Sequence, residues 1–214
     1  MGFTLIDLLA LSIALAAIIA AVRYRQINRR YDPFLYLIWI SLVTEIVINI
    51  LVYSGSDTYI PFNIFPLIEV LLLVWWFHRM RFFKIGSWLL VAIVILSVCW
   101  LVQSLFLEGF TQNMTYFRLL AGFFILVCSS LIIAREAATQ RDPLWQSPVF
   151  LISIGMLIYF SMVIILGVFD IYGVEAKLSS QMQGAMAYVN AFVNFIYAIA
   201  VLCMTRNLRF TLPL

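Results

Sequence analysis

Charged residues are scarce in this sequence. Only 11% of the 214 residues are charged, 65% are hydrophobic, and the mean hydropathy is +1.07. Soluble domains carry about 25% charged and 45–50% apolar residues, so the composition excludes a water-soluble globular protein. The polar segments are too short to form a separate domain, which excludes a built-in kinase, nuclease or nucleotide-binding module. We expect an all-α, polytopic membrane protein.

The residues on which most catalytic and metal sites depend are also few. The one histidine, His78, has no second histidine or cysteine pair nearby, which argues against zinc or haem. Both lysines, Lys84 and Lys177, lie between apolar stretches. The last span therefore has no lysine that could form a Schiff base with retinal. Three cysteines lie inside apolar stretches and are expected to pack as small apolar residues: Cys99, Cys128 and Cys203. We expect no enzyme, no metal, no cofactor and no nucleic-acid partner, although an intramembrane enzyme using an acidic residue stays open.

Long apolar stretches dominate what is present. Each is long enough to cross, or nearly cross, a hydrocarbon core of about 30 Å as a helix. The expected spans are residues 3–22, 34–53, 62–77, 87–107, 115–134, 148–168 and 185–205. The sequence therefore predicts a single seven-helix transmembrane domain over residues 1–214.

The basic residues fall on one side of these spans. Eleven of the 13 lie in alternate connections or the tail: Arg23, Arg25, Arg29, Arg30, Arg79, Arg81, Lys84, Arg135, Arg141, Arg206 and Arg209. Because positive residues stay cytoplasmic, the N-terminus should face outward and the C-terminus the cytoplasm, in the cell's inner (plasma) membrane. Four tryptophans should form an interfacial belt at the inner boundary: Trp75, Trp76, Trp88 and Trp145.

Two dipeptides recur at corresponding places and suggest an internal repeat. They are Asp32-Pro33 with Asp142-Pro143, and Arg81-Phe82 with Arg209-Phe210. Halves 1–84 and 115–210 would then be joined by a linker helix at 87–107, a 3+1+3 layout. In helix count and orientation this layout is similar to the SWEET and PQ-loop sugar and amino-acid carriers. The sequence has no Pro-Gln pair, however, and such short matches also arise by chance.

Four charged residues lie within the expected spans: Asp7, Glu45, Glu69 and Arg118. Each ionised residue at a bilayer centre costs about 2.5 to 3.5 kcal/mol on insertion scales, so these side chains must face the bundle interior, one another or water. Counted from the outer boundary, all four belong to the outer half. Asp7 is the weakest candidate because it could lie at the water interface.

Polar residues extend this pattern along the same helices. Asn49 follows Glu45 by four positions, and the last span carries Asn190, Asn194 and Tyr197 at helical spacing. Gln103, Tyr159 and Ser161 could add to the same interior, and Pro66 interrupts the third span just before Glu69, which frees a backbone carbonyl one turn back. We predict an outward-opening ligand pocket formed by Glu45, Asn49, Glu69, Arg118, Asn190, Asn194 and Tyr197. The alternative is that these residues only tie helices together.

One stretch carries a resemblance. Residues 63–72, with sequence NIFPLIEVLL, are followed by aromatic residues and a basic inner loop. This region resembles the third-helix region of small uncharacterised seven-helix membrane proteins of Bacteroidota. The resemblance implies a sensory role beside histidine kinases.

Three functions remain at this point. The first is a ligand-sensing or ligand-binding module, receptor-like, that acts through a separate cytoplasmic signalling partner. The second is a small-solute or proton-coupled transporter of 3+1+3 layout, with Glu45 or Glu69 binding a proton or cation. The third is a structural subunit beside a neighbouring membrane subunit. The inner halves of the spans are almost wholly apolar and aromatic, which favours sensing or binding over a continuous transport path.

Overall fold

The computed structural model of the chain describes residue 9 and residues 11–81, 86–107, 114–139, 143–173 and 176–204. Its elements are helices: α2 (Ile13–Arg23), α3 (Asp32–Ser54), α4 (Tyr59–Arg79), α5 (Gly86–Val102), α6 (Thr115–Thr139), α7 (Pro148–Tyr172) and α8 (Ala176–Cys203), with short helical turns at Tyr24–Gln26, Arg29–Tyr31, Gln103–Leu107 and Leu144–Gln146. The prediction of an all-α fold with seven helices is confirmed for the described residues.

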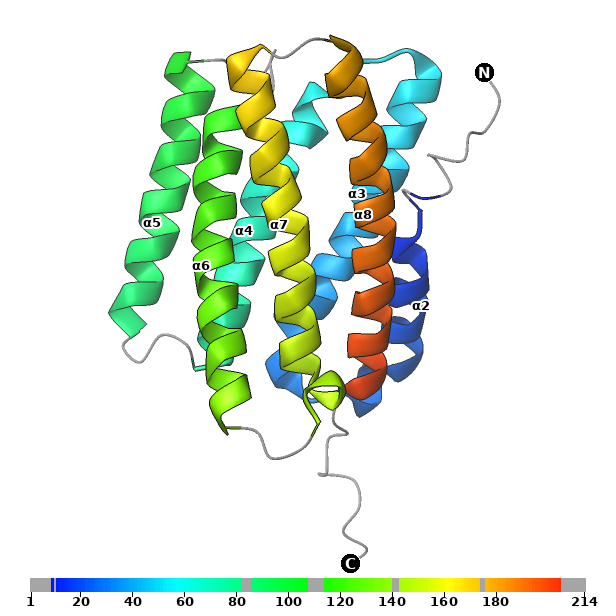
Figure 1. Cartoon of the computed structure of the whole chain (residues 1–214), viewed down its shortest axis with the longest axis vertical. Coiled ribbons are helices and arrows are strands. Elements are labelled where there is room, and N and C mark those ends of the chain that lie inside the picture. The colour runs from blue at the N-terminus through cyan, green and yellow to red at the C-terminus, as the bar shows by residue number, and fades with distance from the viewer. Residues whose placement is uncertain are drawn as a thin grey trace, which may run out of the picture.

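The helices run roughly side by side along the long axis of the molecule, with α5 and α2 at opposite edges of the view (Figure 1). Around the bundle, α6 packs on α7, α7 on α8, α8 on α2, α2 on α3, α3 on α4, and α4 on α5. Because α6 also contacts α4 and α5, the described helices form a closed ring. Side chains on the inner face of this ring are shielded from lipid.

Five of the described helices are long and apolar enough to cross a membrane: α3, α4, α6, α7 and α8. The protein is therefore a multi-pass membrane protein by helix length and hydropathy. The described part of α2 has 11 residues, and the apolar stretch of the fourth predicted span covers Leu90–Leu105. The first predicted span begins at residue 3, outside the described residues, and Asp7 also lies outside them.

Local sequence accounts for where several helices begin and end. Both α3 and α7 carry a proline in the first turn, at Pro33 and Pro148, where no amide hydrogen is needed. The same two helices stop at Gly55 and Gly173, whose φ angles of 69° and 63° suit glycine. The repeat stays a prediction, because Asp142, Phe82, Arg209 and Phe210 lie outside the described residues.

One end of the bundle, here called the basic end, gathers arginines around helix C-termini. The Arg23 guanidinium donates to the Val201 carbonyl at 2.9 Å near the end of α8. The Arg135 guanidinium donates to the Met80 carbonyl at 3.2 Å just past the end of α4. Cations at these positions stabilise the negative ends of the helix dipoles and satisfy carbonyls that lack intrahelical partners.

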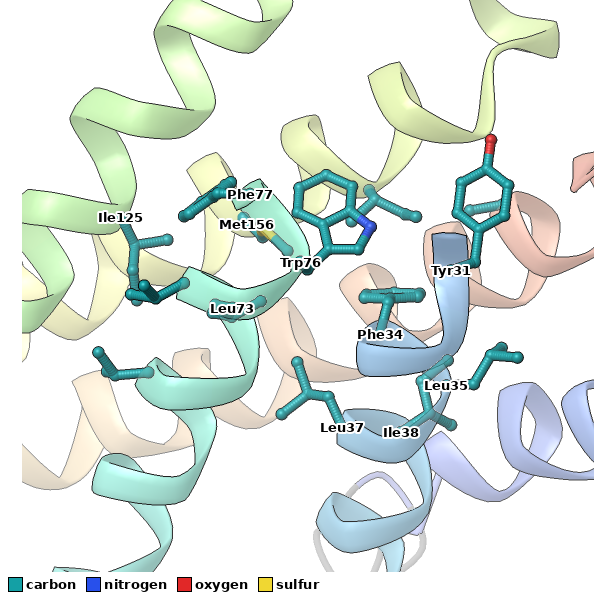
Figure 2. Packing of buried hydrophobic residues seen from close by; sticks show 14 of the residues in the cluster. Tyr31, Phe34, Leu35, Leu37, Ile38, Leu73, Trp76, Phe77, Ile125 and Met156 are labelled. Atoms are coloured by element: carbon teal, nitrogen blue, oxygen red, sulfur yellow. The ribbon is translucent and has the colours of Figure 1, made fainter. Parts of the chain in front are cut away.

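A layer of aromatic side chains fills the interior next to the basic end. Tyr31, Phe34, Trp76 and Phe77 are all fully buried. Figure 2 shows Phe34 and Trp76 between α3 and α4, Phe77 on the side of Trp76 toward Ile125, and Tyr31 at the start of α3. The prediction that Trp76 belongs to an interfacial belt is therefore wrong: its side chain has 0% exposure. Ring–ring contacts with Phe34 and Phe77 hold it in the core. Of the other predicted belt residues, Trp145 is 69% exposed, Trp75 is partly buried, and the Trp88 side chain lies outside the described part.

Candidate functional site

A cavity of about 120 Å³ lies inside the helix ring, bounded by α2, α3, α4, α6, α7 and α8. The structure brings six of the seven residues predicted for the site to its wall: Glu45, Glu69, Arg118, Asn190, Asn194 and Tyr197. Tyr159 of α7, which we expected to add to the same interior, lines it too. Side chains from five predicted spans thus meet at one cavity.

The two carboxylates come from neighbouring helices at mid-depth. Glu45 lies on α3, and Glu69 is the eleventh of the 21 residues of α4. Because α4 extends three residues before and two residues beyond the predicted span, Glu69 stays at the middle of its helix, and the outer-half position stays a prediction. Pro66, one turn earlier in α4, also lines the cavity, and a proline there leaves the Phe62 carbonyl without its usual amide donor.

Arg118 lies in the first turn of α6, whose start is fixed by two buried polar side chains. Asn63 of α4 accepts a hydrogen bond from the Met114 amide at 3.2 Å, and Gln103 accepts one from the Phe117 amide at 2.5 Å. These amides are among those that a helix start leaves without intrahelical acceptors. Gln103 therefore anchors α6 beside the cavity and does not line it, contrary to our expectation.

The three charged groups line one cavity without forming an ion pair. Arg118 is close enough to Glu69 for electrostatic attraction. Among the described residues, however, the ion pair within 4.0 Å is Arg135–Glu136 at the basic end. No side-chain hydrogen bond of Glu45, Glu69 or Arg118 occurs within the described part of the chain. The three half-buried charges thus face the cavity with their hydrogen-bonding capacity open.

Asn194 and Tyr197 of α8 line the cavity and also hold α8 against neighbouring helices. The Asn194 amide donates to the Ser12 hydroxyl at 2.8 Å, which ties α8 to the start of α2. Tyr197 packs edge-on against Phe34, with ring centroids 5.1 Å apart. Its ring also lies so close to Gly155 of α7 that a Cβ there would fall 2.4 Å from it. For Asn194, both the site hypothesis and the helix-tie alternative therefore have a structural basis.

Asn49 is the predicted site residue that the structure does not place at the cavity. Its side-chain amide donates to the Glu45 backbone carbonyl at 2.9 Å, one turn back on α3. An asparagine side chain commonly hydrogen-bonds to a backbone carbonyl of its own helix in this way. The four-residue spacing of Asn49 from Glu45 was therefore not enough to place it at the cavity wall. Ser161 likewise bonds to the Leu157 carbonyl at 2.7 Å.

Sequence reasoning missed three polar residues near the site. Ser41 and Thr44 of α3 line the cavity, and their spacing relative to Glu45 and Ile48 on one helix face could have indicated them. Asp170 lies with Arg118 on an adjoining hollow between α6 and α7. It was missed because the predicted sixth span ended at residue 168, whereas α7 continues to Tyr172.

The cavity differs at its two ends. Toward the end of the bundle opposite the basic end it reaches Pro61 and Phe62, at the start of α4. Toward the basic end it stops at Phe34, behind which lie the fully buried Tyr31, Trp76 and Phe77 (Figure 2). Within the described residues, no group of three histidine, cysteine, aspartate or glutamate side chains could hold a metal ion.

Comparison with known proteins adds no family. No family model matches the chain, and neither a curated protein nor a solved structure matches it significantly. The chain is therefore a helical membrane protein with five long apolar helices, and functional inference depends on the site itself.

Proposed function

We propose that the protein is a membrane-embedded ligand-binding module whose cavity takes a small zwitterion, such as a small amino acid. The observation that supports this most is the convergence of Glu45, Glu69 and Arg118 on one cavity without an ion pair between them. Charges of both signs that lack direct partners are complemented best by a ligand that carries both signs.

The ligand's two ends would be recognised by different helices. A ligand carboxylate suits the planar guanidinium of Arg118, which can donate two parallel hydrogen bonds. A ligand ammonium suits Glu69 and Glu45, with the Asn190 amide, the Tyr159 hydroxyl and nearby aromatic faces as further partners.

The size of the cavity limits the ligand. A cavity of about 120 Å³ is slightly smaller than one of roughly 150 Å³ that holds benzene. A ligand of about six non-hydrogen atoms therefore fits without rearrangement, a size that includes glycine, alanine and β-alanine.

The module is proposed to act as a sensor in the cell's inner membrane, with its N-terminus outside and its C-terminus cytoplasmic. Binding would draw α3, α4 and α6 together around the ligand, and a separate cytoplasmic partner would read the shift at the basic end. The fully buried aromatic layer between the cavity and that end favours binding over an open transport path.

A small-solute or proton-coupled transporter is the second candidate. It is favoured by the mid-depth position of Glu69 on a proline-interrupted helix, as found in carriers with central binding sites. A structural subunit is the third candidate, favoured by the Asn194–Ser12 tie. Uptake of radiolabelled glycine into proteoliposomes separates transport from sensing, because a sensor shows saturable binding without accumulation.

A ligand panel tests the proposal on the purified protein in neutral detergent. We expect glycine, alanine or β-alanine to raise the apparent melting temperature, because a ligand that binds only the folded state stabilises it. Methylammonium and acetate, which each carry one half of the charge pattern, should give much smaller shifts at equal concentration. A full melting-temperature shift with methylammonium alone would indicate that the ligand is a cation and not a zwitterion. No shift with any of the five would contradict ligand binding of this class.

A further inference from the structure

A second hollow, independent of the cavity just described, lies at the basic end. Its volume is about 660 Å³, and it is bordered by the segment before α3, the end of α4, the end of α6 and the start of α7. Four arginines from three separate segments line it: Arg30, Arg79, Arg81 and Arg135. The preference of basic residues for the cytoplasmic side requires only that they lie at this end, not that they converge on one hollow.

Three of these guanidinium groups are held in position. Arg30 bonds to the Tyr31 hydroxyl and lies 4.6 Å from that ring's centroid. Arg79 lies 5.7 Å from the centroid of Trp75, and Arg135 donates to the Met80 carbonyl. A guanidinium that is already ordered loses less conformational entropy when it binds an anion.

The hollow has an excess of positive charge. Glu136 is the acidic residue among the described lining residues. Its carboxylate accepts a hydrogen bond from the Ser147 hydroxyl at 3.2 Å and lies 3.8 Å from the Arg135 guanidinium. Even when Glu136 offsets one arginine, three positive charges remain.

Arg81 adds a backbone feature. Its φ of 54° places a non-glycine residue in the left-handed region just past the end of α4. Glycine is the usual occupant of such a position, since a side chain there is sterically strained. The Arg81 amide donates to the His78 carbonyl at 2.9 Å, whereas its exposed side chain has no hydrogen-bond or ion-pair partner among the described residues. A conformation that favours glycine thus carries a free guanidinium beside the hollow.

We propose that this hollow binds a phosphate group, supplied by the headgroup of an anionic phospholipid. Guanidinium groups match phosphate oxygens in charge and geometry. The hollow lies at the ends of membrane-spanning helices and is much larger than a phosphate ion needs. Basic pockets between helices on the cytoplasmic side are suited to anionic headgroups. Soluble phosphate shares the same chemistry and is distinguished by the experiment.

The test titrates phosphatidylglycerol, or inorganic phosphate at matched ionic strength, into the full chain in neutral detergent, with phosphatidylcholine as the reference lipid. Arg81→Gly should weaken phosphatidylglycerol binding about tenfold, since one charge-assisted contact is lost. Its melting temperature without lipid should stay equal to or above that of the wild type, because glycine relieves the strained φ. Arg81→Lys should retain most of the affinity.

Arg25→Gln is the matched control, because Arg25 is an exposed arginine in the turn after α2 that does not line the hollow. It should leave lipid affinity unchanged. A response to inorganic phosphate but not to lipid would keep the anion site and make a soluble phosphate its ligand. Equal weakening by Arg25→Gln and Arg81→Gly, or no response to either anion, would overturn the proposal.

Discussion

Glu69→Gln and Arg118→Gln are each expected to weaken the binding of the best zwitterion by roughly thirtyfold or more. Loss of one partner of a buried, hydrogen-bonded charge pair costs about 2 to 5 kcal/mol, and each 1.4 kcal/mol is tenfold in affinity. Glutamine keeps the shape of Glu69 but removes the charge that an ammonium group needs. The measurement is an equilibrium titration of purified variants, with the melting temperature recorded beforehand.

The matched control for this pair is Glu136→Gln, which removes a carboxylate at the basic end, away from the cavity. It should leave the affinity for the zwitterion unchanged. Glu45→Gln should weaken binding in the same direction as Glu69→Gln. If Glu69→Gln abolishes expression, and none of the zwitterions raises the melting temperature of the wild type, the intramembrane charges serve only to join helices.

Trp76→Ala is expected to lower the free energy of unfolding by about 3 to 5 kcal/mol, the usual cost of deleting a large, fully buried aromatic side chain. Trp76 has 0% exposure and contacts both Phe34 and Phe77, so its loss leaves a void in the layer that closes the cavity toward the basic end. Denaturation in detergent, followed by loss of helical circular dichroism, measures the change.

Trp145→Ala provides the comparison within the same chain, because Trp145 is 69% exposed. Its effect should be within about 0.5 kcal/mol of the wild type, as for most surface substitutions. Similar destabilisation by both alanine variants would contradict a closed aromatic layer around Trp76.

The sequence was sufficient for the helices and for the charged part of the cavity because membrane burial imposes simple requirements. Apolar length defined α3, α4, α6, α7 and α8. Charged residues inside spans must face the interior, so Glu45, Glu69 and Arg118 could be identified without knowing which helices are neighbours. Their meeting at one cavity is a property of the closed ring, which the sequence does not encode in any short motif.

The errors arise where side-chain direction or helix ends decide the outcome. Asn49 shares a helix face with Glu45 but turns back onto its own helix. Trp76 follows Trp75 directly, yet successive residues on a helix point about 100° apart, so one is buried while its neighbour stays partly exposed. Asp170 was missed because α7 extends beyond the apolar run that predicted it.

Sided thiol labelling shows whether a water-accessible cavity lies inside the ring and opens away from the basic end. Thr44→Cys is at a position that lines the cavity, and Val43→Cys is at a position of α3 that is 59% exposed. The two are compared after Cys99, Cys128 and Cys203 are replaced by alanine. The reagent is a membrane-impermeant methanethiosulfonate applied to either face of sealed vesicles.

We expect Thr44→Cys to react from the face opposite the basic end and glycine to slow this reaction. Val43→Cys should stay unlabelled, because lipid excludes the reagent and suppresses the thiolate. Labelling of Thr44→Cys only from the basic face, or no labelling from either face, would contradict such a cavity.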